Sequence, residues 1–194
     1  MEKIIKKRCA WPADNPLMIK YHDIEWGVPV HNDRKLFEFL LLEGFQAGLS
    51  WMTILNKREN FRKAFDNFDF NKIVLYNKRK INSLMKDTGI IRNKLKIEAA
   101  VTNAKAFIEV RKQFGTFDKY IWGFVNDKPI INNHKRLNDI PPSTKLSDLI
   151  SKDLKKRGFK FVGTTIIYAH MQATGMVNDH TTDCFRYKHI INLK

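Results

Sequence analysis

One carboxylate of this sequence lies inside its most apolar run. The run spans residues 36–57, LFEFLLLEGFQAGLSWMTILNK, and the carboxylate belongs to Glu43. Trp51 follows within the same run, so a flat apolar plate could lie beside a buried hydrogen-bond acceptor. The alternative is an acid at a helix end that points to water, with Trp51 in the core. These residues alone leave both interpretations open.

Two consecutive helices must position this pair. Apolar residues recur at helical spacing from about Arg34 to Ala47, which predicts a helix with Asp33 as its N-cap. Gly48 followed by Leu49 predicts a left-handed C-terminal stop with its hydrophobic contact, and Ser50 is a natural N-cap for the next helix. The two helices would meet at a corner that brings the carboxylate and the indole to one cavity.

Two cysteines and two histidines form a candidate metal site. Their spacing is Cys-x12-His at Cys9 and His22, and His-x3-Cys at His180 and Cys184. Two thiolates with two imidazoles form a closed tetrahedral set that suits structural zinc. Such an ion would tie the two ends of the chain together. The alternatives are a chance arrangement, a disulfide, or ligation by the other histidines, which are His31, His134, His170 and His189.

The charge balance indicates a polyanionic partner. The 194 residues carry a formal charge of +15, while 43% hydrophobic and 12% aromatic residues are typical of a globular protein. Basic residues cluster at 57–63, 78–80, 92–96 and 155–160. Several patches suit a nucleic-acid phosphate track, yet a lysine-rich composition also arises in unrelated proteins. RNA binding would rest on this charge alone and would not explain Glu43.

The segment Ile81–Ala104 is typical of a helix-hairpin-helix. Two helical patterns flank a tight turn that contains Gly89 and is followed by Arg92 and Lys94. A glycine lets the backbone approach DNA closely, and the free amides at the start of the second helix would point at a phosphate. Such contacts position a protein without reading sequence. An ordinary helical hairpin with a glycine turn would look much the same.

The whole chain is predicted to be one all-α domain, residues 1–194. The remaining expected elements are a short helix from Asp69 or Asn71, helices at about 78–87, 94–113 and 117–125, a long loop at 126–142, a helix capped by Ser143 or Ser147 and ended by Gly158, and a last helix at 162–174 ended by Gly175. No apolar run follows the basic N-terminus, and the uncharged stretch 161–178 is too polar to span a bilayer. We therefore expect a cytoplasmic protein with no membrane partner.

The motifs add up to a family resemblance. They are RCAW (8–11), YHD (21–23), EWGVP (25–29), LEG (42–44), QAGLSW (46–51), KREN (57–60), GIIR (89–92), LKKRGFKFVGTT (154–165) and NDH (178–180). Together they resemble 3-methyladenine DNA glycosylase I, the TAG family of the helix-hairpin-helix glycosylase superfamily, over about residues 8–184. The resemblance implies an all-helical fold in which a zinc site joins the N- and C-terminal segments.

The resemblance also assigns roles to residues. It makes Cys9, His22, His180 and Cys184 the ligands of a structural Zn2+, and it places Trp11, Tyr21, Glu43 and Trp51 in a base pocket, with Trp26 as a candidate further wall. Glu43 would be the catalytic group, because it would accept from the exocyclic amine and oppose the charge of the methylated base. Gly89, Arg92 and Lys94 would contact the DNA backbone.

The activity that the resemblance implies is DNA repair, in a protein of bacterial type that is associated with the nucleoid through DNA. A monomeric enzyme would flip 3-methyladenine out of alkylated double-stranded DNA, hydrolyse its N-glycosidic bond, release the free base and leave an abasic site. The alternative is a non-catalytic, zinc-containing module that binds damaged DNA.

Some positions depart from the family pattern. Met18 stands where a further tyrosine is frequent, which would remove one contact of the pocket. The tail at 185–194, FRYKHIINLK, has no family pattern. The superfamily's usual catalytic aspartate is not expected in this branch, and Asp118 and Asp127 are the only candidates for it.

Overall fold

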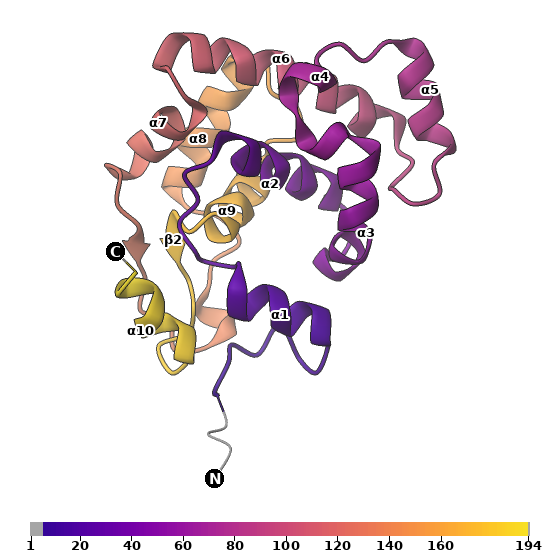
Figure 1. The fold of residues 1–194 in the computed structure, drawn as a ribbon. Coiled ribbons are helices and arrows are strands. Elements are labelled where there is room, and N and C mark those ends of the chain that lie inside the picture. The colour runs from indigo at the N-terminus through magenta and orange to yellow at the C-terminus, as the bar shows by residue number, and fades with distance from the viewer. Residues whose placement is uncertain (1–5, 194) are drawn as a thin grey trace.

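The protein is predominantly helical in its computed structural model, which describes residues 6–193 (Figure 1). The helices are α1 (Pro16–Ile24), α2 (Asp33–Gln46), α3 (Trp51–Ala64), α4 (Phe70–Ile73), α5 (Lys78–Lys86), α6 (Lys94–Phe114), α7 (Phe117–Trp122), α8 (Lys145–Lys156), α9 (Thr164–Ala173) and α10 (Phe185–Ile191). The 3-10 turns are η1 (Asp66–Phe68), η2 (Gly123–Val125) and η3 (Leu137–Asp139). The strands β1 (Ile130–Ile131) and β2 (Val177–Asn178) form a parallel pair, which an all-α prediction did not include.

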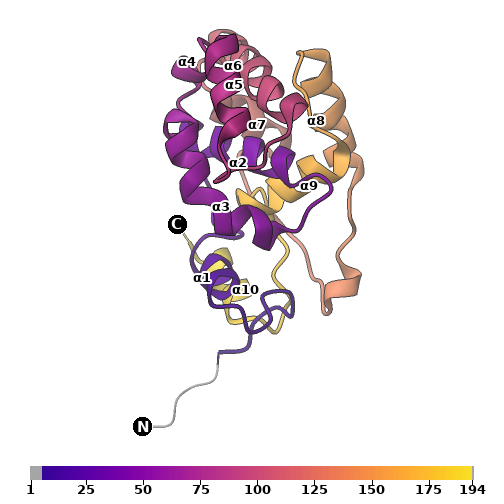
Figure 2. The same ribbon diagram turned by 90° about the vertical axis from the view of Figure 1, so that its right-hand side faces the viewer.

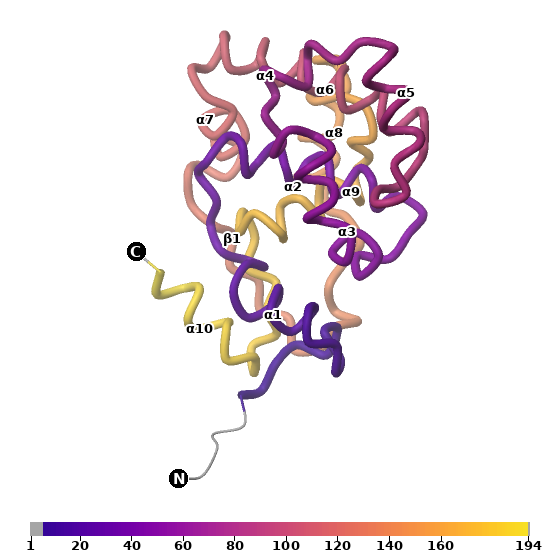
Figure 3. Tube along the Cα trace, turned by 45° about the vertical axis from the view of Figure 1, so that its right-hand side comes forward, coloured from indigo at the N-terminus to yellow at the C-terminus, as the bar shows by residue number. Residues whose placement is uncertain are grey.

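The helices divide between two ends of the molecule. Figures 1 and 2 both show α4–α7 at one end and α1 with α10 at the other, while α2 and α9 cross the middle. Figure 3 shows the early chain around α1 and the late chain around α10 lying at the same end. The middle helices α2 and α9 contact each other, and α2 also contacts α3 and α6. The first and last parts of the chain therefore meet beside the central helix.

The central helix α2 is apolar on every side. Every residue from Leu36 to Phe45 is buried, including the acids Glu38 and Glu43. A helix that is hydrophobic all round must be enclosed by other elements, and α2 is enclosed by α3, α6, α7 and α9. The apolar run of the sequence thus forms the middle of the fold.

The predicted N-cap of α2 was wrong by one residue. Asn32 is the N-cap, and its side chain accepts from the amide of Lys35 at 3.1 Å. The Asp33 carboxylate instead accepts from the amides of Phe117 and Asp118, at 3.2 and 2.9 Å, and thereby stabilises the start of α7. A carboxylate at a helix N-terminus is favourable in either place, and only the tertiary contact decides which helix it serves.

The corner after α2 forms largely as predicted. Gly48 has a left-handed φ of +79°, and the Ser50 side chain accepts from the amide of Thr53, so that α3 begins at Trp51. Leu49 is 42% exposed, so it lies at the surface of this corner. Local capping chemistry is sufficient to turn the chain here.

The C-terminal third contains the larger corrections. Thr144 caps α8, not Ser143 or Ser147, and Ser147 completes a capping box with it. Gly158 and Gly175 do take left-handed φ values after α8 and α9. The helix at 162–174 is not the last one, because α10 follows it. The N-cap of α10 is Cys184, and a thiol is not a residue that sequence rules recognise as a cap.

The long predicted loop, residues 126–142, is held against the C-terminal segment. Strand β1 pairs with β2, the amide of Asn132 donates to the carbonyl of Asn178, and the amide of Thr182 donates to the carbonyl of His134. These backbone bonds fix a stretch that the sequence gives no reason to consider ordered. Within the described residues, no helix combines the length and apolar character that a membrane crossing would need.

Candidate active site and metal centre

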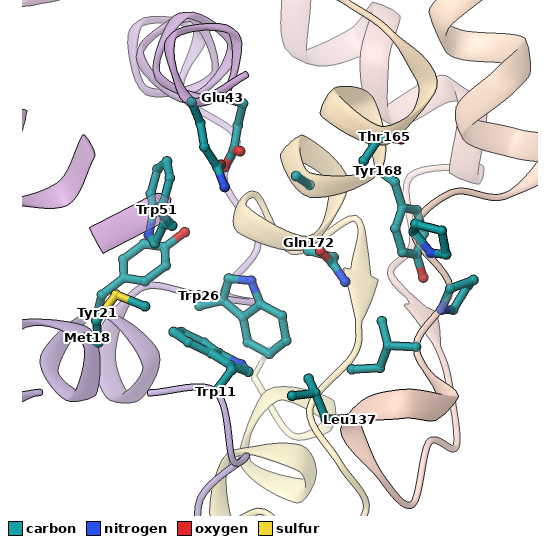
Figure 4. A pocket seen from close by; sticks show the side chains of 15 residues that line it. Trp11, Met18, Tyr21, Trp26, Glu43, Trp51, Leu137, Thr165, Tyr168 and Gln172 are labelled. Carbon is teal, nitrogen blue, oxygen red and sulfur yellow. The ribbon is translucent and has the colours of Figure 1, made fainter. Parts of the chain in front are cut away.

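A cavity of about 410 Å³ lies between α1, α2, α3 and α9. Trp11, Tyr21, Trp26, Glu43 and Trp51, which the sequence predicted for the pocket, all line it. Figure 4 shows Glu43 directed into the cavity from α2, with Trp51 and Tyr21 on one side and Tyr168 on the other. The volume is within the range of small-molecule sites.

Aromatic rings from three separate segments make one side of the cavity. Trp11 precedes α1 and packs edge-on against Trp26 at 5.2 Å between ring centroids, while Tyr21 of α1 lies 5.3 Å from Trp51 of α3. The indole Nε1 atoms of Trp11 and Trp51 are buried and have no hydrogen-bond partner within residues 6–193. Such unpaired donors usually mark a place where a ligand or water supplies the acceptor. Met18 lines the same side, so its position is part of the pocket.

Glu43 is buried without a partner. Its side chain is 4% exposed, and no hydrogen bond or ion pair reaches its carboxylate from the described part of the chain. Burial raises the pKa of Glu43 to about 8, because a charge in an apolar cavity loses its hydration. A cation that entered the cavity would favour the ionised form again.

The other buried acid of α2 has the opposite surroundings. Glu38 accepts from Arg58 Nε at 2.7 Å and from Arg62 Nη2 at 2.7 Å. Arg58 in turn donates to Glu25, at the C-terminal end of α1. Glu38 is therefore part of an ion-pair network that holds α1, α2 and α3 together, whereas Glu43 is available to a ligand.

Tyr21 adds a second polar group to the cavity. It is 3% exposed, and burial, followed by the nearby Glu43, raises its pKa well above the usual value. Its hydroxyl has no partner within residues 6–193. The phenol thus stays protonated and can donate to a ligand.

The residues on the opposite side of the cavity were not predicted from the sequence. Helix α9 contributes Thr165, Tyr168 and Gln172, which lie on one helical face. The loop before α8 contributes Leu137, Ile140, Pro141 and Pro142, and the end of α2 contributes Gln46. The signals available were the motif that ends at Thr165 and the helical spacing of the α9 residues, but neither shows which face of α9 meets the pocket. Asp118 and Asp127, the candidates for a catalytic aspartate, do not line the cavity.

The predicted metal ligands meet in a buried cluster. One ligand atom from each of Cys9, His22, His180 and Cys184 lies within 4.8 Å of the others. His180 Nδ1 is 3.5 Å from Cys9 Sγ and 3.6 Å from Cys184 Sγ, and His22 Nε2 is 3.5 Å from Cys184 Sγ. Four nitrogen and sulfur atoms at these separations could surround one tetrahedral ion.

Surrounding groups orient both imidazoles toward the sulfur atoms. His22 Nδ1 donates to Asp23 at 2.8 Å, and His180 Nε2 donates to the Trp26 carbonyl at 3.1 Å. Arg8 holds the Asp23 carboxylate through Nε and Nη2. Metal-bound histidines commonly have such a carboxylate or carbonyl on the second nitrogen.

The sulfur atoms are prepared for ligation as well. The Thr181 amide donates to Cys9 Sγ and the Arg186 amide donates to Cys184 Sγ, both at 3.4 Å. The hydrogen bond between the two cysteines raises the pKa of Cys9 and, with the bonds from His180 and His22, lowers the pKa of Cys184, so Cys184 is the thiolate of the pair before a metal binds. Thiolate is the form that binds a metal, so the residues fit a closed two-cysteine, two-histidine site.

The predicted hairpin consists of α5, a turn at residues 87–93, and α6. The Gly89 amide donates to Asp87 Oδ1 at 2.8 Å, so it is not one of the free donors of the turn. A side chain at Gly89 would come within 3.2 Å of Asn60, so the glycine permits close packing on α3. The amides of Thr88, Ile91 and Arg92 have no partner in the described chain, and those of Ile91 and Arg92 are the free donors nearest to α6. Arg92 and Lys94 are exposed beside them.

The fold and the cavity define a class: a helical protein with a cavity that is lined by indoles and an unpaired carboxylate, a lining that suits a planar, electron-poor ring. The chain belongs to the methyladenine glycosylase family, whose sequence model matches residues 11–187. The family resemblance of the sequence is thereby confirmed.

Individual relatives agree with this membership over nearly the whole chain. The sequence is 49% identical over 181 residues to DNA-3-methyladenine glycosylase 1 of Escherichia coli (strain K12), with 93% of this chain and 97% of the relative covered. Among solved structures, a 3-methyladenine DNA glycosylase I superposes with a TM-score of 0.89 at 51% identity, over 92% of this chain and 98% of the other. The Staphylococcus aureus glycosylase, solved to show how it recognises 3-methyladenine, also gives 0.89, at 34% identity over 92% and 95%.

Proposed function

We propose that this chain is a DNA glycosylase that removes 3-methyladenine from alkylated double-stranded DNA. The observation that carries the proposal is the buried, unpaired carboxylate of Glu43 inside an aromatic cavity. Methylation at N3 gives the adenine of DNA a positive charge, and a desolvated carboxylate is the group that such a base would pair with. The relatives named above bear this base in their names.

The cavity requires the base to leave the helix. Its walls enclose about 410 Å³, and a stacked base could not enter between them. Flipping a nucleotide costs a few kcal/mol, and less when the base is damaged. Stacking on Trp51 and Trp11 would offset this cost by roughly 1–3 kcal/mol per base face.

Polar groups would then select the base. Glu43 accepts from the exocyclic amine, and Tyr21 donates from its buried hydroxyl. The entering cation lowers the pKa of Glu43 from about 8, so the carboxylate ionises as the complex forms. A neutral adenine gives no such compensation for the buried charge.

Hydrolysis needs little from the protein. The bond between C1′ of the sugar and N9 breaks, its electron pair neutralises the charged base, and a water oxygen bonds to C1′ and loses a proton. The base leaves neutral without being protonated. The attraction of Glu43 for the base falls as this charge disappears, so Glu43 acts mainly by increasing the population of the flipped, reactive nucleotide.

The hairpin would hold the DNA backbone. The free amides of Ile91 and Arg92 lie in the turn just before α6, whose dipole favours an anion, and Arg92 and Lys94 add positive charge. These groups would contact phosphates irrespective of the sequence. Gly89 would contribute by letting the turn pack on α3.

A structural zinc ion would complete the fold. Cys9, His22, His180 and Cys184 would hold it as a closed set with no open position, so its contribution is to stability and not to the reaction. We propose a monomer, because one chain supplies the cavity, the metal ligands and the hairpin.

Release of free base tests the proposed function. Purified protein is incubated with methylated duplex DNA, and the supernatant is analysed by chromatography for 3-methyladenine. Appearance of the free base together with abasic sites supports the proposal. Tight binding to the methylated duplex without any release would instead identify a non-catalytic module for damaged DNA.

A further inference from the structure

A carboxylate behind the cavity fixes two of its lining side chains. Tyr168 and Gln172 lie one turn apart on α9, and both donate to Asp179 Oδ2, from the hydroxyl at 2.7 Å and from Nε2 at 2.8 Å. Asp179 is 1% exposed and follows directly after β2. Asp179, which lies outside the cavity, therefore holds the polar groups of Tyr168 and Gln172 in place.

The other oxygen of Asp179 is bound as well. Asn132, which follows β1, donates from Nδ2 to Asp179 Oδ1 at 2.6 Å. The backbone bonds between this loop and the C-terminal segment hold Asn132 in place. With both oxygens engaged by separate elements, the carboxylate cannot rotate away from α9 without losing hydrogen bonds.

These contacts determine which way the Gln172 amide points. Because Nε2 donates to Asp179, the carbonyl oxygen Oε1 is left as an acceptor, and within residues 6–193 no donor reaches it. Figure 4 shows the Gln172 side chain at the cavity between Glu43 and Leu137. Gln46, the other glutamine of the cavity, makes no side-chain hydrogen bond in the described chain, so nothing comparable fixes the orientation of its amide.

The chemistry of the base matches a second acceptor. The exocyclic amine is the only N–H donor group of 3-methyladenine, and it carries two hydrogens. One carboxylate can accept one of them, which leaves the other unpaired in a desolvated cavity. A buried donor without a partner is unfavourable, and an acceptor that is already oriented would remove this cost without reorganisation.

We infer that Gln172 is a specificity-determining residue whose side-chain carbonyl accepts a hydrogen bond from the amine of the base, and that Asp179 is the positioning residue that fixes the amide in this orientation. The inference rests on the proposed function, since it assumes that the cavity binds the methylated base. It extends base recognition from α2 and α3 to α9.

The test compares two ligands that differ only in the amine. Affinities for 3-methyladenine and for 3-methylpurine, which lacks the amino group, are measured by quenching of the cavity tryptophans. Gln172→Met keeps the length of the side chain but removes both amide groups. We expect it to reduce the preference for 3-methyladenine over 3-methylpurine by about three- to tenfold, the effect of one hydrogen bond.

Tyr168→Phe is the matched control. It also removes one donor to Asp179, but it leaves the bond from Gln172 in place, so the preference for the amine should stay at the parent value. If Gln172 had a merely structural role, the variant would lower the affinities for both ligands equally and leave the ratio of the two affinities unchanged. If Gln172→Met melts more than a few degrees early, Gln172→Asn, which withdraws the carbonyl by one bond, is measured in its place.

The outcomes separate the two proposals. A parent protein that neither binds 3-methyladenine nor releases it from methylated duplex DNA overturns the proposed function itself. A parent that does both, but binds 3-methylpurine equally well, overturns the inference. A parent that shows the preference, with a Gln172 variant that retains it in full, overturns the inference alone. Loss of the preference in the Gln172 variant and its retention in Tyr168→Phe supports both.

Discussion

The Cys–His cluster and the cavity at Glu43 lie side by side, because Trp11 and Trp26 of the cavity pack against His22 and His180. The two regions differ in whether their polar groups have hydrogen-bond partners. Around the cluster, each imidazole has a partner for its second nitrogen and each sulfur accepts an amide. In the cavity, the carboxylate of Glu43, the hydroxyl of Tyr21 and two indole nitrogens have no partner among residues 6–193. Both regions are buried, so exposure does not explain the difference.

The difference indicates which kind of ligand each region is suited to bind. Buried polar groups are normally satisfied, and a cluster whose surrounding hydrogen bonds are complete would lack only the ion that we propose at its centre. The unsatisfied groups of the cavity come from segments far apart in the chain, and a flat ligand with donors and charge would satisfy them together. We therefore expect changes in the cluster to affect folding and changes in the cavity to affect binding.

The largest effect should come from Cys184→Ser. The parent should contain about one zinc per chain by elemental analysis. Loss of one ligand should reduce the metal content and lower the free energy of unfolding by about 3 kcal/mol, which corresponds to a melting temperature about 10 °C lower. Base affinity of the folded fraction should change little.

The control for this variant is Asp183→Asn, which changes the exposed neighbour that pairs with Lys7. It should keep both the metal and the melting temperature. Absence of zinc from parent protein purified without chelator would remove the metal proposal.

Glu43→Gln should reverse the pattern. The change keeps the size of the side chain but removes the charge, so excision and free-base affinity should fall, excision by about 100-fold, or about 2.7 kcal/mol. The melting temperature should stay at the parent value or rise, because an unpaired buried charge disfavours folding.

Glu38→Gln is the matched control on the same helix. It breaks pairs with Arg58 and Arg62, so it should lower the melting temperature and leave free-base affinity of the folded protein intact. A Glu43 variant that melts early and binds the base normally would show that the cavity assignment is wrong.

The pH dependence of stability offers a smaller, graded test. The pKa of Glu43 is about 8 in the folded protein and 4.5 in the unfolded chain, so the folded state holds the proton longer. The contribution of Glu43 to the free energy of unfolding is complete below pH 4.5. Between pH 4.5 and pH 8 this contribution falls by at most about 1.4 kcal/mol per pH unit, and above pH 8 it no longer changes. Denaturant titrations of the parent and Glu43→Gln at pH 5 and pH 8 should show the variant gaining relative stability at the higher pH. A constant difference would mean that Glu43 has an ordinary pKa.

The smallest effect should come from Arg92→Ala in the hairpin. Losing one phosphate contact should weaken binding to all duplexes by a few-fold and reduce the slope of log affinity against log salt by about one. Free-base affinity should not change. Lys112→Ala, near the other end of α6, is the control and should leave DNA binding unaltered. An equal loss of duplex and free-base affinity would point to misfolding.

The sequence predicted those parts of the site that depend on local chemistry. Gly48 and Ser50 specify the corner between α2 and α3. This corner brings Glu43 and Trp51 to the same cavity. The four candidate metal ligands could be recognised in the sequence because a set of two cysteines and two histidines is a common way to bind zinc.

The parts that were missed depend on tertiary contacts. The wall formed by α9 is fixed by Asp179, and the sequence does not reveal that its partners include Asn132 from a distant loop. Asp33 was assigned to the wrong helix for the same reason, since its partners lie at the start of α7. Capping rules identify a residue that can accept amide protons, but they do not identify which amides will be near it.

The order of the metal ligands along the chain has a consequence during synthesis. Cys9 and His180 are 171 positions apart, and Cys184 and His22 are 162 apart. On a ribosome the aromatic side of the cavity emerges first, while α9, Asp179 and the last two ligands emerge at the end. Closing so long a loop costs entropy that an early fragment cannot recover. We therefore expect nascent chains to remain unable to capture a base until the segment around Cys184 has been translated.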